Sequence, residues 1–287
     1  MKYCFFLLAL LCSTSLSGQA QQDTTLYRIE TLDGNEYIGM IMSQEADIIM
    51  LKTDQLGIIQ IKKADVKNIS PVVRKQMKGG VYWFENPQST RYFWQANGYG
   101  LKPGEGYYQN VWILFNQVTV GVTENLQIGA GLMPTFLFGT GLVPVWITPK
   151  LSIPISKDQF NVGLGAFVGT VIGEFDAGYG VLYGSATVGS RDKNLSLGVG
   201  YGYLGDEISN APVITLSGML RTGQRGYLMM ENYLAIGEDT QELILFIGGR
   251  RLIKRSGLDF GLLIPTGIED QLVAVPWLSL SIPFGKR

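Results

Sequence analysis

The sequence predicts an all-β fold, with an antiparallel transmembrane β-barrel of about 12 strands preceded by a small five-stranded β domain. The first observation is a repeated unit from Thr90 onward, in which apolar residues alternate with small or polar ones up to a turn. In 194–203, for example, leucine, valine and tyrosine share one parity, and serine and glycine the other. Second, beyond the N-terminus no apolar run approaches the about 18 residues of a membrane helix. With 46% hydrophobic and 16% charged residues, the chain needs a large β core or a face toward lipid.

Residues 1–20 are predicted to be a signal peptide. Lys2 supplies a positive charge, residues 3–12 an apolar core, and residues 18–20 the cleavage motif. The chain is therefore expected to be exported, and cleavage would remove both cysteines, Cys4 and Cys12. Of 23 basic and 24 acidic residues, only Lys2 lies in this segment, and such a balance predicts no nucleic-acid partner.

Residues 21–72 are predicted to form the small β domain on the periplasmic side. Its five strand-like segments are 26–32, 36–42, 47–53, 56–61 and 66–69, with a tight turn at Asp33-Gly34. At Gly34, Gly39, Asp47 and Met50 the domain resembles the first Sm motif. The resemblance implies an SH3-like or Sm-like shape. It does not imply RNA binding, because the second Sm motif has no counterpart in this chain.

Residues 73–89 are expected to be a linker. They contain Arg74, Lys75 and Lys78, followed by Gly79-Gly80 and three consecutive aromatics, 82–84. The favoured interpretation is a connection that ends in the first interfacial aromatics of the barrel. The alternative is a basic patch that contacts the phosphates of inner-leaflet lipids.

Residues 90–287 are predicted to form the barrel. Its twelve expected strands are 90–97, 109–122, 126–134, 145–155, 159–170, 178–189, 194–203, 212–221, 226–236, 241–251, 257–264 and 271–284. Inner connections such as 123–125 are short, whereas the outer ones include the longer 98–108 and 135–144. Acidic residues gather in the later outer loops and basic residues around the inner turns, which supports this topology.

The chain contains no histidine, which excludes histidine-dependent hydrolysis and histidine-ligated metals. No enzymatic activity, metal site or cofactor is therefore predicted. The remaining candidates are carboxylate pairs in the outer loops, Asp206-Glu207, Glu238-Asp239 and Glu269-Asp270. One interpretation is a mouth that concentrates cations. The favoured one is that surface carboxylates keep the rim solvated or share divalent cations with anionic lipid headgroups.

Extending the alternation predicts which charged side chains face the lumen. Besides Arg91, they are Lys150, Glu231, Glu242, Arg250 and Asp259. Charges of both signs fit a salt-bridged filling or a polar pore wall. The filled interior is slightly favoured, because small barrels fill their interiors with side chains.

The end of the final predicted strand, residues 277–284, alternates and finishes at the outward Phe284. It resembles the closing strand of outer-membrane barrels, which implies recognition by the barrel-assembly machinery. The whole chain resembles uncharacterised bacterial outer-membrane barrel proteins with a small N-terminal β domain, which implies the outer membrane of a diderm bacterium and its lipid. The first functional hypothesis is passage or binding of a small solute across that membrane. The alternative is a non-conducting anchor that presents its periplasmic domain to a protein or the cell wall.

Overall fold

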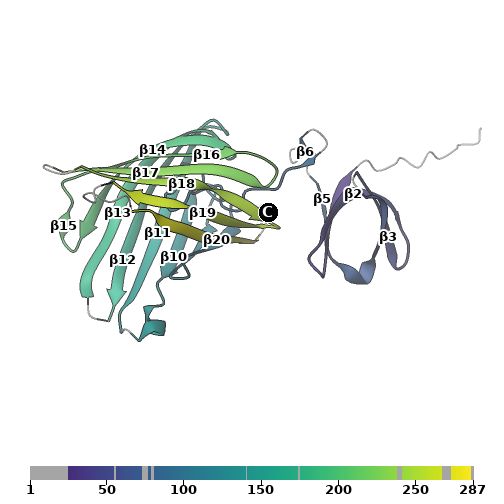
Figure 1. Cartoon of the computed structure of the whole chain (residues 1–287), viewed down its shortest axis with the longest axis horizontal. Coiled ribbons are helices and arrows are strands. Elements are labelled where there is room, and N and C mark those ends of the chain that lie inside the picture. The colour runs from purple at the N-terminus through teal and green to yellow at the C-terminus, as the bar shows by residue number, and fades with distance from the viewer. Residues whose placement is uncertain are drawn as a thin grey trace, which may run out of the picture. The chain divides into compact units, whose positions relative to one another are not determined.

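The computed structural model describes residues 25–54, 56–72, 77–78, 81–139, 141–173, 175–237, 241–266 and 273–285. The predicted signal peptide lies outside these residues. The chain divides between Gly79 and Gly80 into two compact units, both built from β-strands (Figure 1). Among the described residues, no helix is long and apolar enough to cross a membrane.

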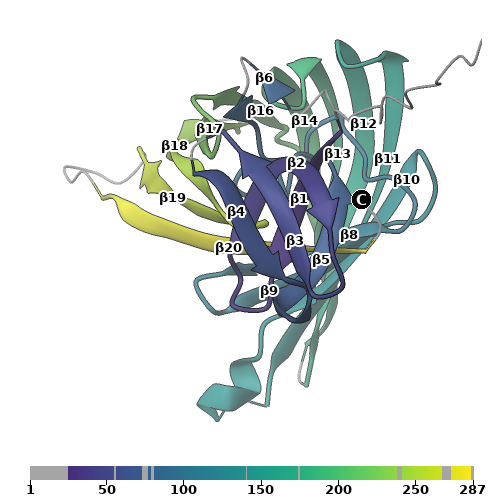
Figure 2. The same ribbon diagram turned by 90° about the vertical axis from the view of Figure 1, so that its right-hand side faces the viewer.

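The N-terminal unit is a five-stranded antiparallel sheet in the order β4-β3-β2-β1-β5 (Figure 2). Its strands are β1 (Leu26–Thr31), β2 (Glu36–Gln44), β3 (Ile48–Thr53), β4 (Gly57–Lys62) and β5 (Val66–Pro71), with the 3-10 turn η1 (Lys63–Asp65) before β5. All five predicted strands are present within a few residues of their expected bounds. The predicted likeness to SH3 or Sm domains stays a prediction.

Alternation along these strands builds a small core. Ile29, Ile49, Leu51 and Ile61 are each at most 6% exposed and pack together. The predicted turn at Asp33-Gly34 joins β1 to β2, and Gly34 takes the left-handed conformation there, with φ of 79°. Glycine adopts this conformation without the steric cost that a Cβ imposes.

The second unit contains a closed antiparallel barrel. Its strands are β8 (Glu105–Val111), β9 (Phe115–Gly121), β10 (Leu126–Leu132), β11 (Val143–Ser156), β12 (Phe160–Ile172), β13 (Phe175–Ser190), β14 (Lys193–Leu204), β16 (Val213–Arg221), β17 (Gly226–Ile236), β18 (Gln241–Ile253), β19 (Ser256–Pro265) and β20 (Val275–Gly285). The shorter elements of this unit are β7 (Val81–Tyr82), β15 (Glu207–Ile208) and the 3-10 turn η3 (Thr135–Phe138), and the short β6 (Met77–Lys78) precedes the boundary at Gly79. β20 pairs with β8, for example at Leu280 and Asn110, and this pairing closes the circle of twelve strands.

The predicted number of barrel strands is confirmed, but the predicted first two strands are wrong. Residues 90–97 form no strand, and the predicted strand 109–122 is instead the hairpin β8–β9. Its turn places Trp112 and Ile113 at positive φ, 50° and 68°, where Gly, Asn and Asp are usual. The turn is stabilised because Asn110 Nδ2 donates to Asn116 Oδ1 at 2.9 Å. The two errors cancel in the count.

The predicted outer loop 98–108 is also wrong, because this stretch leads directly into β8. β8 begins where β20 ends, with Glu105 opposite Gly285. The start of β8 and the end of β20 lie at the same end of the barrel as the short turns after β9, β11, β13, β16 and β18. We call this end the turn end. The opposite end, with the connections after β8, β10, β12, β14, β17 and β19, is called the loop end.

The wall alternates as predicted. Along β14, Leu195, Leu197, Val199 and Tyr201 are between 45% and 58% exposed, whereas Ser196 between them is fully buried. Leucine, isoleucine and valine dominate the outward positions of the other strands as well. A closed barrel with an apolar outer face leaves no sheet edge unpaired and suits hydrocarbon surroundings, as in outer-membrane barrels.

Candidate functional site: a chain segment clamped inside the barrel

Residues 84–104 run inside the barrel, and we call them the inner segment. Gln88, Thr90, Tyr92, Phe93 and Asn97 are each fully buried. The segment turns back on itself at residues 92–95, where the Tyr92 N–H donates to the Gln95 carbonyl at 3.0 Å. Next to this turn, Arg91 and Ala96 form an isolated antiparallel β-bridge. It then returns to the turn end, where the Gly104 N–H donates to the Gly121 carbonyl at 3.1 Å.

Glu231 on β17 holds the tip of the inner segment. Its Oε2 accepts hydrogen bonds from the N–H groups of Phe93, Trp94 and Gln95 at 2.9, 3.0 and 3.0 Å. Its Oε1 accepts a further bond from the Tyr233 hydroxyl at 2.6 Å. Three successive N–H groups form a concave site that suits an anion, and here the barrel wall supplies that anion. Bonds to a charged carboxylate are stronger than neutral ones.

Arg250 on β18 holds the entry of the inner segment. One terminal guanidinium nitrogen donates to Asn86 Oδ1 at 2.8 Å and to the Gln88 carbonyl at 2.7 Å. The other donates to Gln88 Oε1 at 3.0 Å and the Tyr92 carbonyl at 3.1 Å. Asp259 on β19 pairs with the same guanidinium, with Nε and Oδ1 2.6 Å apart. The Asp259 carboxylate thereby balances the buried positive charge of Arg250, and the N–H groups of the guanidinium all have acceptors.

Lys150 on β11 holds both arms of the hairpin. Its ammonium donates to the carbonyls of Thr90, Asn97 and Tyr99 at 3.4, 2.8 and 2.6 Å. Thr90 lies before the tip, and Asn97 and Tyr99 lie after it. The Lys150 side chain therefore joins the entering arm of the inner segment to the returning arm. Three donors on a compact ammonium match three carbonyl acceptors.

Further contacts hold the returning arm near the turn end. The Gly98 N–H donates to Thr187 Oγ1 at 2.8 Å, and Arg191 donates to the Gly100 carbonyl at 2.7 Å. The Arg191 guanidinium also lies 4.7 Å from the centre of the Tyr99 ring. Burial raises the pKa of the Tyr99 hydroxyl, and the negative charge of Asp158 adds to that rise. Tyr99 therefore stays neutral and keeps donating to the Gly189 carbonyl.

On the loop-end side of the inner segment lies a layer of aromatic rings, which we call the aromatic floor. Its members are Phe93, Trp94, Trp112, Phe115, Trp146, Phe167, Tyr179, Tyr233, Phe246 and Trp277. Trp94 at the segment's tip lies 5.5 Å from Phe115 and 6.3 Å from Phe167, measured between ring centres. The tip of the inner segment and the wall thus share one aromatic cluster.

Of the six predicted lumenal charges, Arg91 is buried and belongs to the inner segment itself, and the structure places the other five as follows. Lys150, Glu231, Arg250 and Asp259 are at most 1% exposed and lie at the inner segment. Glu242 lies near the loop end of β18 with its side chain exposed. Asp206, just before β15, and Glu207, its first residue, are both exposed. Glu238, Asp239, Glu269 and Asp270 lie outside the described residues, and the part of the chain that is described holds no group of three or more metal-ligating side chains.

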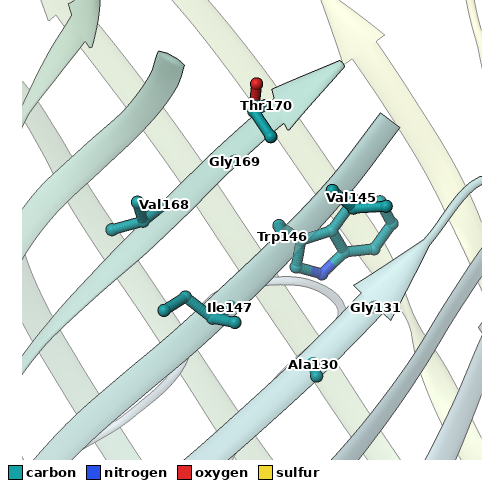
Figure 3. A pocket seen from close by; sticks show the side chains of 8 residues that line it. All are labelled: Ala130, Gly131, Val145, Trp146, Ile147, Val168, Gly169 and Thr170. Carbon is teal, nitrogen blue, oxygen red and sulfur yellow. The ribbon is translucent and has the colours of Figure 1, made fainter. Parts of the chain in front are cut away.

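A shallow apolar hollow of about 460 Å³ lies across β10, β11 and β12 (Figure 3). Ala130, Ile147 and Val168 are opposite one another on these strands and belong to the outward-facing set. Gly131, Trp146 and Gly169 form the row beside them, with Trp146 turned toward the lumen and 4% exposed. The hollow is therefore part of the apolar outer surface and lies apart from the inner segment.

Sequence reasoning missed the inner segment because it treated 90–97 as a strand of the wall. One signal was available: Tyr92, Phe93 and Trp94 are three consecutive bulky residues, whereas a wall strand alternates large and small. The predicted linker, 73–89, also overlaps the segment, because Asn86 and Gln88 bond to Arg250 inside the barrel.

No protein-family model and no curated protein matches the chain. A solved structure described as "Outer-membrane expressed OmpT of Vibrio cholerae" is similar, with 10% identity and a TM-score of 0.35. The match covers 91% of this chain and 94% of that one.

The prediction that this chain is not an enzyme was too general and is corrected. The sequence argument excluded only chemistry that needs histidine or thiols, and carboxylates and lysine can also act in acid–base catalysis. The exclusion is therefore withdrawn. No activity or catalytic residue follows for this chain from a likeness at that TM-score.

Proposed function

We propose that this protein is an outer-membrane barrel closed by its own inner segment, which anchors the N-terminal five-stranded unit at the membrane. The observation that supports this is the clamping of the inner segment's backbone by Glu231, Arg250 and Lys150. A lumen lined for solute passage has no need to bind the backbone of its own chain at positions spread from Gln88 to Tyr99.

The N-terminal unit is assigned to the periplasm in this proposal. The inner segment enters and leaves at the turn end, and short turns lie on the periplasmic side of bacterial barrels. The unit would then meet a periplasmic protein or the cell wall. The basic residues near the turn end and the acidic residues near the loop end agree with this orientation. The proposal also includes recognition of the last strand, β20, by the barrel-assembly machinery.

Conductance in a planar bilayer tests the closed state. The full chain should give no reproducible current steps, whereas a variant with a short Gly-Ser replacement for residues 86–98 should conduct. Reproducible steps from the unaltered chain would reject the anchor and favour the passage of a solute.

Thiol labelling tests the closed state independently, without relying on the fold of the shortened variant. Asn97 is fully buried, and Cys4 and Cys12 are the only cysteines, so a chain with both replaced and Asn97→Cys carries one thiol. A membrane-impermeant maleimide should label this thiol only after unfolding. Leu32→Cys, which is 67% exposed in the wild-type chain, is the matched control for rapid labelling.

A further inference from the structure

We propose that the aromatic floor is a binding site for a small organic cation, specifically an alkylammonium compound that also carries an oxygen atom. The proposal does not depend on the proposed function, because a barrel closed by its inner segment still presents this surface at the loop end. Nothing in the anchor role requires such a site.

The rings are accessible, which a purely structural filling would not need. Trp94, Trp112, Phe115, Phe167, Tyr179 and Tyr233 are only half-buried. Two of them pack against buried rings, Tyr233 against Phe246 and Trp112 against Trp277, with ring centres 6.1 and 4.8 Å apart. Ligand sites combine such aromatic walls with a few placed polar groups.

The aromatic faces favour a cation. The face of an aromatic ring carries the negative part of its quadrupole and attracts ammonium and guanidinium groups. The floor already contacts one cation of the chain itself, since the Arg91 guanidinium lies 5.9 Å from the centre of the Trp94 ring. Quaternary ammonium groups are the ligands that aromatic cages commonly hold.

The charge around the loop end favours the same ligand. Glu242 shares its parity along β18 with Phe246, so it belongs to the lumenal side of that strand, and it is exposed. Asp206 and Glu207 lie exposed at the same end. The sequence places no lysine or arginine in the connections after β8, β10, β12, β14, β17 or β19. A rim of one sign concentrates ions of the opposite sign.

One buried donor indicates the oxygen atom. Trp277 is 5% exposed, and its indole Nε1 has no hydrogen-bond partner among the described residues. A buried N–H without an acceptor is costly. The nitrogen is covered in the structure, so a ligand hydroxyl accepts from it once the side chains over it move aside. The indole of Trp146, by contrast, donates to Gln117 Oε1 at 2.9 Å.

Choline is the probe for this site, and 3,3-dimethylbutan-1-ol is its neutral counterpart of nearly equal shape. Binding to the full chain in maltoside micelles is followed by titration calorimetry and tryptophan fluorescence. Choline should bind saturably and the neutral alcohol at least about tenfold more weakly. Equal binding of both compounds would overturn the cation assignment, and binding of neither would overturn the site.

Variants locate the site. Trp94→Leu and Glu242→Gln should each weaken choline binding, the first about tenfold. Trp83→Leu is the matched control, because Trp83 lies by Arg221 near the turn end and outside the aromatic floor. Each variant is compared only if it keeps heat-modifiable gel mobility. Undiminished choline binding by both floor variants would overturn the proposal, while the conductance test of the closed barrel would be unaffected.

Discussion

Arg250 and Asp259 lie directly opposite each other on β18 and β19, and both side chains are almost fully buried in the lumen. Their fork of two bonds, 2.6 Å from Nε to Oδ1 and 2.9 Å from the second nitrogen to Oδ2, fixes the guanidinium. The remaining donors then point at the inner segment. One ion pair of the wall thus orients the cation that binds the segment's entry.

Arg250→Met should destabilise the barrel by about 3–5 kcal/mol, because it leaves the Asp259 carboxylate buried without its partner. Urea unfolding in lipid vesicles, followed by tryptophan fluorescence, measures this. Arg251→Met is the matched control, since Arg251 is the exposed neighbour on the same strand. Equal losses in the two variants would contradict the role of the pair.

Gly98→Ala should displace the returning arm of the inner segment. A Cβ at Gly98 would lie 2.5 Å from the Asn161 carbonyl oxygen, and this backbone atom of β12 cannot rotate away. Overpacking of this kind costs about 1–3 kcal/mol. Faster maleimide labelling of the Asn97→Cys thiol is the expected result. Gly141→Ala, where a Cβ would meet nothing within 4 Å, should leave the rate unchanged.

Leu197→Arg tests the lipid-facing girdle. Leu197 is 58% exposed midway along β14, and a cation near the bilayer midplane costs a barrel about 2–4 kcal/mol. The unfolding free energy in vesicles should fall by that amount. Leu32→Arg, at a position in the turn after β1 of the N-terminal unit where Leu32 is 67% exposed, should have little effect. Similar small effects at both sites would show that position 197 does not face hydrocarbon.

The pKa of Asp33 should lie below its ordinary value. The Thr31 hydroxyl donates to its carboxylate, and so does the Asn35 backbone N–H at 3.2 Å. A lowered pKa in the folded state means that the stabilisation is present above the unfolded value and is lost as pH falls through the folded one. Carbon-13 NMR titration of Asp33 in the full chain should show the low midpoint, and Thr31→Val should raise it. An unchanged midpoint in that variant would contradict the hydrogen bond as its cause.

The sequence determined the wall of this protein. Period-two alternation in segments such as 194–203 fixed which side chains face outward, because successive residues of a strand point to opposite faces. It also placed Lys150, Glu231, Arg250 and Asp259 on the inward parity. Local spacing was sufficient for these inferences, and the turn at Asp33-Gly34 was found in the same way.

Only the tertiary structure decided what these inward charges bind. Most partners of Lys150, Glu231 and Arg250 are backbone N–H and carbonyl groups of residues 88–99. Every sequence possesses such groups, and no residue pattern marks them. Glu231 and Phe93 are separated by 138 positions along the chain, and such contacts form only when the barrel closes around the segment. Closure itself, with β20 against β8, is likewise a long-range pairing that no local periodicity specifies.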